Sequence, residues 1–272
     1  MNSIVITGSS SGMGKSTAKK FAEKGWKVAA TMRKPENETE LNRLDNITLY
    51  ALDVTDGVSL VKATEQILDD FGTVDVVLNN AGYALAGPFE ATTPEQIQQQ
   101  FEVNVLGLMR VTRAFLPHFR ANKAGLFLNI SSVGGLITFP LISLYHSTKW
   151  AVEGFSESLA YELGELGIQV KIIEPGGVDT DFSGRSMVMA SHEGLTEYDA
   201  AVTKMMDAMA ARSNGPGRST AEQLAEAIYQ AATDGKNQLR YLVGADAEQL
   251  VGLRRTQGDQ VYITTIKQQM LS

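Results

Sequence analysis

Residues 3–14 of the chain read SIVITGSSSGMG, and this stretch decides the fold. The apolar run Ile4–Thr7 predicts a short buried strand, and an amphipathic helix is expected over 13–24. Glycines permit a tight turn between the two, and they let bare backbone N–H groups approach a phosphate at the start of a helix. The stretch therefore predicts a strand, a turn and a helix that together bind the pyrophosphate of a dinucleotide.

The glycine spacing leaves one alternative to weigh. It reads G-x-x-x-G-x-G rather than the G-x-G-x-x-G of the standard dinucleotide fingerprint, and Gly14-Lys15-Ser16 resembles the end of a nucleotide-hydrolysing phosphate loop. That loop needs a glycine five positions before Gly14, where this chain has Ser9. Nucleotide hydrolysis is therefore not expected.

Strand and helix patterns alternate along the rest of the chain. Nearly continuous apolar runs predict strands at Ile4–Thr7, Lys27–Thr31, Thr48–Leu52, Val74–Leu78, Leu126–Ile130, Gln169–Glu174 and Arg240–Val243. Helical patterns lie near 13–24, 57–71, 94–121, 144–164, 220–234 and 247–255. This order predicts an α/β fold with a doubly wound (Rossmann) parallel seven-stranded sheet, helices on both faces, and ligands at the carboxyl ends of the strands. We expect a single Rossmann-type domain over 1–272, with a Met-rich substrate-binding insert around 183–219.

The composition excludes several classes of function. The 272 residues carry 24 basic and 31 acidic side chains, a net charge of −7 with no basic block, so neither nucleic acid nor an anionic membrane is an expected partner. There is no cysteine, and His118, His146 and His192 lack metal-ligand spacing, so we expect no disulfide, thiolate or metal chemistry. No leader-like segment or long apolar run is found, and we expect a cytoplasmic protein.

A tyrosine and a lysine four positions apart, Tyr145 and Lys149, predict an acid/base pair. On a helix these side chains share one face, so the ammonium can lie beside the phenol. A neighbouring cation stabilises the phenolate and lowers the pKa of a tyrosine from about 10 toward the range in which it exchanges protons. His146 would point about 100° away from Tyr145, so we interpret it as a bystander.

With these motifs in place, the sequence resembles the short-chain dehydrogenase/reductase family. The resemblance covers residues 1 to about 182 and rests on six segments in the same order: Thr7–Gly14, Asn79–Gly82, Asn104, Ser132, Tyr145 with Lys149, and Pro175-Gly176 with Thr180. The segment that follows Ser132 is most similar to hydroxysteroid and retinol dehydrogenase members. The resemblance implies a catalytic domain that transfers a hydride between a nicotinamide and a carbonyl or secondary alcohol.

The resemblance also implies a role for each catalytic residue. Tyr145 would give a proton to the carbonyl oxygen or take one from the alcohol, and Lys149 would contact the nicotinamide ribose. Ser132, thirteen positions before Tyr145, would bind the substrate oxygen, with Ser131 as a structural neighbour. Asn104 lies inside an otherwise helical pattern, where asparagine costs about 0.5 kcal/mol relative to alanine, and the family implies a water-held proton relay at this residue.

Cofactor contacts are implied at the ends of several strands. The set consists of Gly8, Ser10, Ser11, Gly12, Met13, Gly14, Arg33, Asp53, Val54, Asn80, Ala81, Gly82, Tyr145, Lys149, Pro175, Gly176, Val178 and Thr180. Within it, the Asp53 carboxylate would meet the adenine amino group. The second strand ends at Arg33 without a carboxylate, which favours NADP(H) over NAD(H). Ser10 and Ser11 occupy loop positions where many phosphate-preferring relatives carry a basic residue.

The substrate is the least constrained part of the prediction. We expect an apolar pocket lined by Leu136, Ile137, Phe139 and Leu141, by the segment 83–89 and by the methionines of 183–210. Such a pocket predicts a lipophilic ketone, aldehyde or secondary alcohol, and no charged anchor is evident. The resemblance implies a homodimer or homotetramer formed through the long helices near 94–121 and 144–164. The alternative is a non-catalytic dinucleotide-binding sensor or scaffold, which the intact motifs disfavour.

Overall fold

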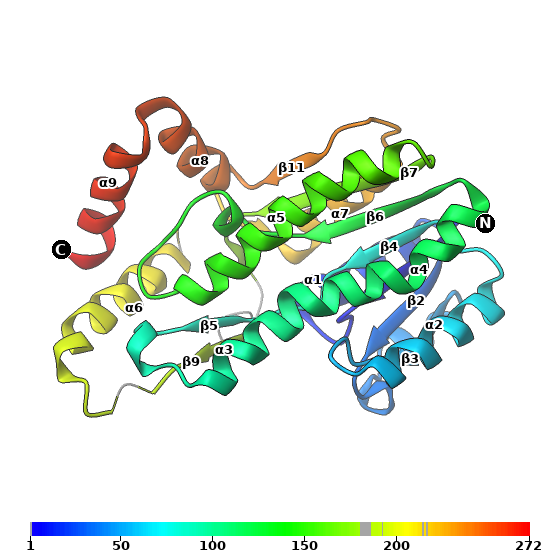
Figure 1. The fold of residues 1–272 in the computed structure, drawn as a ribbon, viewed down its shortest axis with the longest axis horizontal. Coiled ribbons are helices and arrows are strands. Elements are labelled where there is room, and N and C mark those ends of the chain that lie inside the picture. The colour runs from blue at the N-terminus through cyan, green and yellow to red at the C-terminus, as the bar shows by residue number, and fades with distance from the viewer. Residues whose placement is uncertain (1, 180–185, 192, 214, 216) are drawn as a thin grey trace.

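Seven parallel strands form the central sheet of the computed structural model, in the order β11-β7-β6-β4-β1-β2-β3 (Figure 1). The structure describes residues 2–179, 186–191, 193–213, 215 and 217–272. The strands are β1 (Ser3–Thr7), β2 (Lys27–Met32), β3 (Ile47–Ala51), β4 (Val76–Asn79), β6 (Gly125–Ile130), β7 (Ile168–Pro175) and β11 (Arg240–Val243). The predicted doubly wound parallel sheet is confirmed. Its order reverses at β1, between β4 and β2, which is the place where such sheets bind ligands.

Helices cover both faces of the sheet. On one face lie α1 (Gly12–Glu23) and α7 (Ala221–Thr233), and on the other lie α2 (Gly57–Phe71), α4 (Leu108–Asn122) and α5 (Ser143–Gly164). Successive strand side chains point to opposite faces, so Ile4 and Ile6 join the cluster under α1 and α7, whereas Val5 joins the cluster under the other three helices. Burial on both faces explains the nearly continuous apolar runs.

The helix predicted over 94–121 is confirmed in extent, but it is not a regular α-helix throughout. The segment forms α3 (Pro94–Phe101), a π-helical stretch over Glu102–Gly107, and then α4. A Cβ at Gly107 would lie 2.7 Å from Val54 Cγ2, and the Asn104 side chain is bonded to the backbone of Tyr83. The π-helical stretch therefore coincides with two close contacts, of Gly107 with Val54 and of Asn104 with the backbone of Tyr83.

Several of the remaining elements gather at one end of the molecule, on the left in Figure 1. They include α6 (Asp199–Ser213), α8 (Ala245–Gln257), α9 (Asp259–Leu271), and the parallel pair of β5 (Ala84–Ala86) with β9 (Met187–Met189). A second short pair joins β8 (Val178–Asp179) to β10 (Ser219–Thr220). Short 3₁₀ turns cover Pro35–Asn37, Leu41–Arg43, Phe89–Ala91, Val133–Gly135 and Thr196–Tyr198. The predicted helix over 247–255 is confirmed within α8, whereas α9 was not predicted.

Candidate functional site

The glycine loop is fastened to the end of β4 by Thr7 and Asn80. Asn80 Nδ2 donates to the carbonyl oxygens of Thr7 (2.9 Å) and Gly8 (3.1 Å), and the Thr7 hydroxyl accepts the backbone N–H groups of Asn80 (2.9 Å) and Ala81 (3.1 Å). Gly8 has a φ of 72°, a conformation that favours glycine. A Cβ on Gly14 would overlap the Gly8 carbonyl oxygen and lie 2.6 Å from Asn80 Nδ2. The sequence therefore needs glycine here so that loop, helix and strand can approach one another.

A cavity of about 870 Å³, here named the glycine-loop cavity, lies over this loop. Twelve of the predicted cofactor residues line it: Gly8, Ser10, Ser11, Gly12, Met13, Gly14, Arg33, Asp53, Val54, Asn80, Ala81 and Gly82. Residues 186 and 188, beside or within β9, also border it and were not predicted. The N-terminus of α1 faces this space with no side-chain cap, and the buried Asn80 Oδ1 has no partner among the described residues. These features fit a dinucleotide whose pyrophosphate meets the loop N–H groups.

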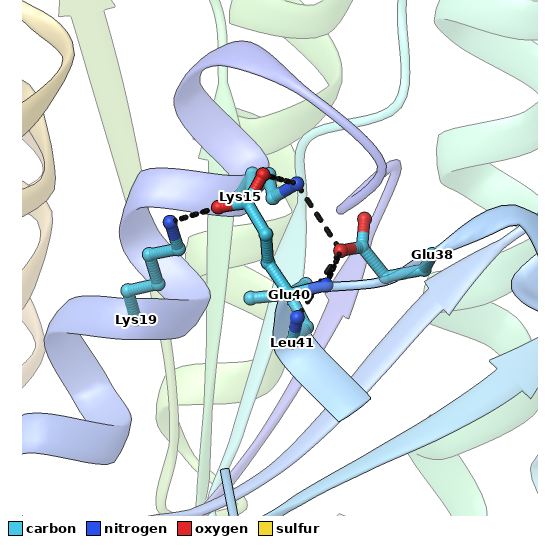
Figure 2. A network of polar contacts seen from close by, with 5 residues as sticks. All are labelled: Lys15, Lys19, Glu38, Glu40 and Leu41. Atoms are coloured by element: carbon cyan, nitrogen blue, oxygen red, sulfur yellow. Dashed lines mark hydrogen bonds and ion pairs between the residues drawn. The ribbon is translucent and has the colours of Figure 1, made fainter. Parts of the chain in front are cut away.

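The segment that follows Arg33 is pinned to α1 by a polar network (Figure 2). Glu38 accepts the backbone N–H groups of Glu40 (2.8 Å) and Leu41 (3.1 Å), and it lies 3.1 Å from the Lys15 ammonium. Glu40 is bonded to Lys15 (2.8 Å) and Lys19 (2.6 Å), and hydrogen bonds from these lysines lower the pKa of Glu40 to about 2. The network holds both lysines on α1 against the segment after β2.

Arg33 and Asp53 lie at the ends of β2 and β3, in the wall of the glycine-loop cavity. Arg33 is exposed, as is its neighbour Lys34. Asp53 is half-buried, and its Oδ1 accepts the backbone N–H (2.9 Å) and hydroxyl (2.7 Å) of Thr55. These bonds fix the Asp53 carboxylate, while the Arg33 guanidinium faces solvent where a phosphate can reach it.

Tyr145, Ser132 and Lys149 lie together at the start of α5. The Ser132 hydroxyl is hydrogen-bonded to the Tyr145 hydroxyl, and Lys149 Nζ lies 5.7 Å from the centre of the Tyr145 ring. Lys149 is buried and donates to the Ile130 carbonyl oxygen at 2.9 Å. Burial lowers the pKa of Lys149 to about 8, and the negative charge of Glu153 opposes this shift.

The pKa of Tyr145 shifts in the direction opposite to the sequence-based expectation. Burial raises it above 10, and the hydrogen bond from Ser132 opposes that rise. The reason is geometric, because the Lys149 ammonium points to the Ile130 carbonyl oxygen and lies above the ring. In this state of the protein, loss of solvent dominates the pKa of the phenol.

Asn104 braces the site from the π-helical stretch. Its Oδ1 accepts the Tyr83 N–H (3.0 Å), and its Nδ2 donates to the Tyr83 carbonyl oxygen (2.8 Å) and the Thr148 hydroxyl (3.1 Å). The residue is 2% exposed, and it joins the segment after β4 to α5 directly beside Lys149. Asn104 was an unfavourable residue within a predicted helix, and the backbone at this position is π-helical rather than α-helical.

His146 also holds the site in place, so its interpretation as a bystander is wrong. Its Nε2 accepts the Phe139 N–H (2.8 Å), so Nδ1 carries the proton and donates to the Gly134 carbonyl oxygen (2.8 Å). Burial lowers the pKa of His146 and keeps the ring neutral. The ring therefore holds the 134–139 segment in place. A local sequence pattern does not predict this contact.

A second cavity of about 770 Å³, here named the Tyr145 cavity, opens in front of Tyr145. Ser132, Tyr145, Pro175, Gly176 and Val178 line it, and Met13 belongs to the walls of both cavities. Thr180 lies outside the described residues. Asn104 and Lys149 are buried behind these walls and border neither cavity.

The apolar wall of the Tyr145 cavity differs from the predicted one. Phe139, Ala84, Met187 and Met209 line it as expected, together with Leu250, Leu253 and Met270 of the C-terminal helices. Leu136, Ile137 and Leu141 instead pack into the core cluster under those helices, and Met205 is fully buried there. Arg212 and Arg218 also border the cavity, so charged groups that the sequence did not reveal lie in its wall.

Neither a bilayer-spanning helix nor a metal-binding cluster is found within the described ranges. No helix there combines the length and apolarity needed to cross a membrane. The same residues contain no grouping of three or more histidine, cysteine or acidic side chains suited to a metal ion.

Two known relatives share much of this sequence. An uncharacterised oxidoreductase of Schizosaccharomyces pombe is 40% identical over 242 residues, which cover 88% of this chain and 99% of the relative. A 3-ketodihydrosphingosine reductase of Bacteroides thetaiotaomicron is 38% identical over 180 residues, which cover 66% of this chain and 65% of the relative.

Solved structures share the fold. A short-chain dehydrogenase of Streptomyces avermitilis superimposes with a TM-score of 0.84 at 32% identity and covers 98% of both chains. ElxO, solved with NADP bound, superimposes with a TM-score of 0.74 at 28% identity and covers 92% of this chain and 98% of ElxO. The family model for short chain dehydrogenases matches residues 2–189. The protein therefore belongs to the short-chain dehydrogenase/reductase family of oxidoreductases.

Proposed function

We propose that the protein is an NADP(H)-dependent oxidoreductase that interconverts a lipophilic carbonyl compound and its alcohol. The observation that carries this proposal is the placement of the Tyr145 hydroxyl, bonded to Ser132 and backed by Lys149, in a cavity that meets the glycine-loop cavity at Met13. A reacting carbon in front of Tyr145 would then lie next to a ligand held by the loop.

The residues suggest a simple division of roles. The hydroxyls of Ser132 and Tyr145 would hold the carbonyl oxygen, and Tyr145 would donate its proton to that oxygen during reduction. The Lys149 ammonium would stabilise the phenolate that remains, and Asn104 would keep α5 and the segment after β4 in register. A bound nicotinamide dinucleotide would supply the hydride in this direction and accept it in the reverse direction.

The preference for NADP(H) rests on the charges after β2. Arg33 lines the glycine-loop cavity, Lys34 follows it, and β2 itself ends at Met32 without a carboxylate. A guanidinium binds a 2′-phosphate through paired hydrogen bonds, whereas a carboxylate at this position would repel it. The NADP bound in ElxO supports the same preference.

The apolar lining of the Tyr145 cavity supports a lipophilic substrate. Phenylalanine, leucine and methionine side chains form much of its wall, and one relative is named a 3-ketodihydrosphingosine reductase. With a homologous series of ketones, we expect kcat/KM to rise by about fourfold for each methylene that enters the cavity, because burying a CH₂ contributes about 0.8 kcal/mol. Steady-state rates measured across the series test this, and a flat series would contradict an apolar site.

The central test is Tyr145→Phe, with Tyr161→Phe as its matched control. Tyr161 lies on the same helix and is 76% exposed. Tyr145→Phe should lower kcat by at least about 100-fold, since a positioned acid/base contributes that much, while NADPH affinity stays unchanged in a fluorescence titration. Tyr161→Phe should behave as the wild type. Full turnover by Tyr145→Phe would remove Tyr145 from the acid/base role, whereas a wild type that oxidises NADPH with no carbonyl compound of a broad panel would favour the scaffold alternative.

We also propose that the whole chain forms one catalytic domain that assembles into a homodimer or homotetramer. Trp150 of α5 is 45% exposed, and a large apolar side chain left at a surface suits a contact between subunits. Light scattering of the purified protein gives its oligomeric state. The cytoplasmic location stays a prediction.

A further inference from the structure

Two glutamates from different elements are buried side by side behind the Ser131–Ser132 segment. Glu153 of α5 is 5% exposed and Glu174 of β7 is 1% exposed. Arg240 Nε lies 3.1 Å from an oxygen of Glu153 and 3.3 Å from an oxygen of Glu174, so the two carboxyl groups converge on one nitrogen atom. Two ionised carboxylates this close repel each other, whereas a protonated carboxyl group can donate a hydrogen bond to an ionised one.

One arginine supplies the direct ion-pair contacts to both carboxyl groups. Arg240 Nε of β11 lies 3.1 Å from Glu153 Oε2 and 3.3 Å from Glu174 Oε1, but its Nη2 is 2.6 Å from Glu157 Oε2 near the surface. Arg255 of α8 acts on Glu174 only through its charge. The guanidinium that contacts the pair is thus shared among three carboxyl groups, and a proton bound between Glu153 and Glu174 would reduce the repulsion within the buried pair.

On the side that faces Ser131, the pair is covered by the backbone of Gly135, which carries no side chain. A Cβ on Gly135 would lie 2.6 Å from Ser131 Oγ and 3.1 Å from Glu153 Oε1, so both atoms face the same glycine. No donor among the described residues makes a hydrogen bond to Oε1 of Glu153 or Glu174, and Ser131 Oγ has no partner there either. Acceptor atoms that are buried without donors are costly when charged, which again favours a shared proton.

Lys149 lies one helical turn before Glu153 on the same face of α5. It is itself buried, and its Nζ donates to the Ile130 carbonyl oxygen, directly before Ser131. The charged groups that face the pair are therefore Lys149 and Glu157 of α5, Arg240 of β11 and Arg255 of α8. Among them, Lys149 is the one that also contacts Tyr145.

We propose that Glu153 and Glu174 share one proton and are positioning residues for Lys149, whose ammonium is kept charged by the single negative charge of the pair. Burial, followed by the charge of Glu153, raises the pKa of Glu174 well above its usual value, in agreement with this arrangement. The link to turnover rests on the proposed function, whereas the shared proton is a property of the folded chain alone.

Infrared spectroscopy of the ligand-free protein tests the shared proton. With ¹³C-labelled glutamate at neutral pH, the wild type should show the C=O stretch of one protonated carboxyl group. Glu153→Gln and Glu174→Gln should each abolish it, because the remaining glutamate ionises beside Arg240. Glu157→Gln removes a carboxylate from the same arginine and should keep the band. A wild type without the band, or a band that persists in either of the first two variants, overturns the proposal.

Titration of the lysine ¹³Cε resonances tests the effect on Lys149, with Lys149→Met as the assignment control. Glu153→Gln should lower the pKa of Lys149 by about one unit, since it removes the nearest negative charge. Glu174→Gln should not lower it, because Glu153 keeps its charge, and Glu157→Gln should leave it unchanged. An unaltered pKa in Glu153→Gln, or an equal fall in Glu157→Gln, rules out the positioning role.

Kinetics then separate this inference from the proposed function. With any carbonyl compound that the wild type reduces, Glu153→Gln should move the alkaline limb of the kcat/KM profile to lower pH by the shift seen in the lysine titration. A purely structural role would instead lower kcat/KM equally at all pH values. If the wild type reduces no carbonyl compound, the proposed function fails, while the infrared and resonance measurements still decide the carboxyl pair.

Discussion

The glycine loop is held by hydrogen bonds to Ile6, to Thr31 and to residues 79–82, whereas the wall of the Tyr145 cavity combines β5, the 131–146 segment, the end of β7, α6, α8 and α9. The loop depends on backbone geometry that only certain residues permit at certain positions. The cavity wall depends on which distant side chains happen to meet. The glycine loop therefore has a recognisable sequence pattern, whereas the wall of the Tyr145 cavity has almost none. For this reason the reaction class is far easier to infer from the sequence than the substrate.

The sharpest way to break the first region is Gly14→Ala. The added Cβ would overlap the Gly8 carbonyl oxygen and crowd Asn80, and such overpacking costs about 1–3 kcal/mol, or about 5-fold to 150-fold in NADPH affinity. Fluorescence titration measures the loss. Gly154→Ala is the control, because nothing lies within 4 Å of its added Cβ, and it should stabilise α5 by about 0.5–1 kcal/mol. Equal NADPH affinity in Gly14→Ala would show that the loop tolerates a side chain.

Arg33→Ala is expected to affect the same region more selectively. Loss of its charged hydrogen bonds to a 2′-phosphate should weaken NADPH binding by about tenfold, since such bonds contribute about 1.5 kcal/mol or more. NADH binding should not change, so the ratio of the two dissociation constants is the readout. Lys62→Ala, an exposed cation on α2, is the control. A proportional loss for both dinucleotides would remove Arg33 from phosphate recognition.

Tyr262→Phe probes the second region. The Tyr262 hydroxyl donates to the Thr138 carbonyl oxygen at 2.9 Å and ties α9 to the cavity wall. Its loss should cost about 1 kcal/mol of stability and raise KM for the carbonyl substrate, with NADPH affinity unchanged. Thermal unfolding and steady-state kinetics measure the two effects. A change in NADPH affinity instead would mean that the two regions are not independent.

The smallest expected effect is a change in how stability depends on pH in Glu174→Gln. Burial raises the pKa of Glu174 from 4.5 to about 8, so between these values the folded protein holds a proton that the unfolded chain releases. The contribution is therefore complete below pH 4.5 and is lost as pH rises through 8. At alkaline pH the glutamine variant should melt higher than the wild type by about 1–3 °C, with no such gain in mild acid. Melting curves with parallel pH dependence would contradict a raised pKa.

Local sequence patterns were sufficient to predict much of the fold. The seven strands, the glycine turn and the placement of Tyr145 beside Lys149 followed from apolar runs, glycines and helical spacing, and the structure agrees. The π-helical turn at Asn104 was signalled only as an unfavourable residue in a helix. The bracing role of His146 and the Glu153–Glu174 pair depend on partners between 7 and 21 positions away, and a single sequence does not show which distant residues meet.

The direction of the Tyr145 pKa shows a second limit. Helical spacing correctly predicted that Lys149 lies near the Tyr145 ring. It did not indicate where the ammonium points or how much water reaches the phenol. Those depend on the Ile130 carbonyl oxygen and on the depth of the site. Proximity is thus readable from spacing, whereas the sign of an electrostatic effect is not.

Met13 belongs to the walls of both cavities, and its side chain is half-buried between them. The polarisable thioether of Met13 can be oxidised, and the resulting sulfoxide would replace an apolar side chain with a polar, chiral one. One oxygen atom added to this sulfur would disturb both halves of the site together, whereas oxidation of Met187, Met209 or Met270 would alter the Tyr145 cavity alone. Peroxide would therefore affect both cavities at once through the side chain of Met13.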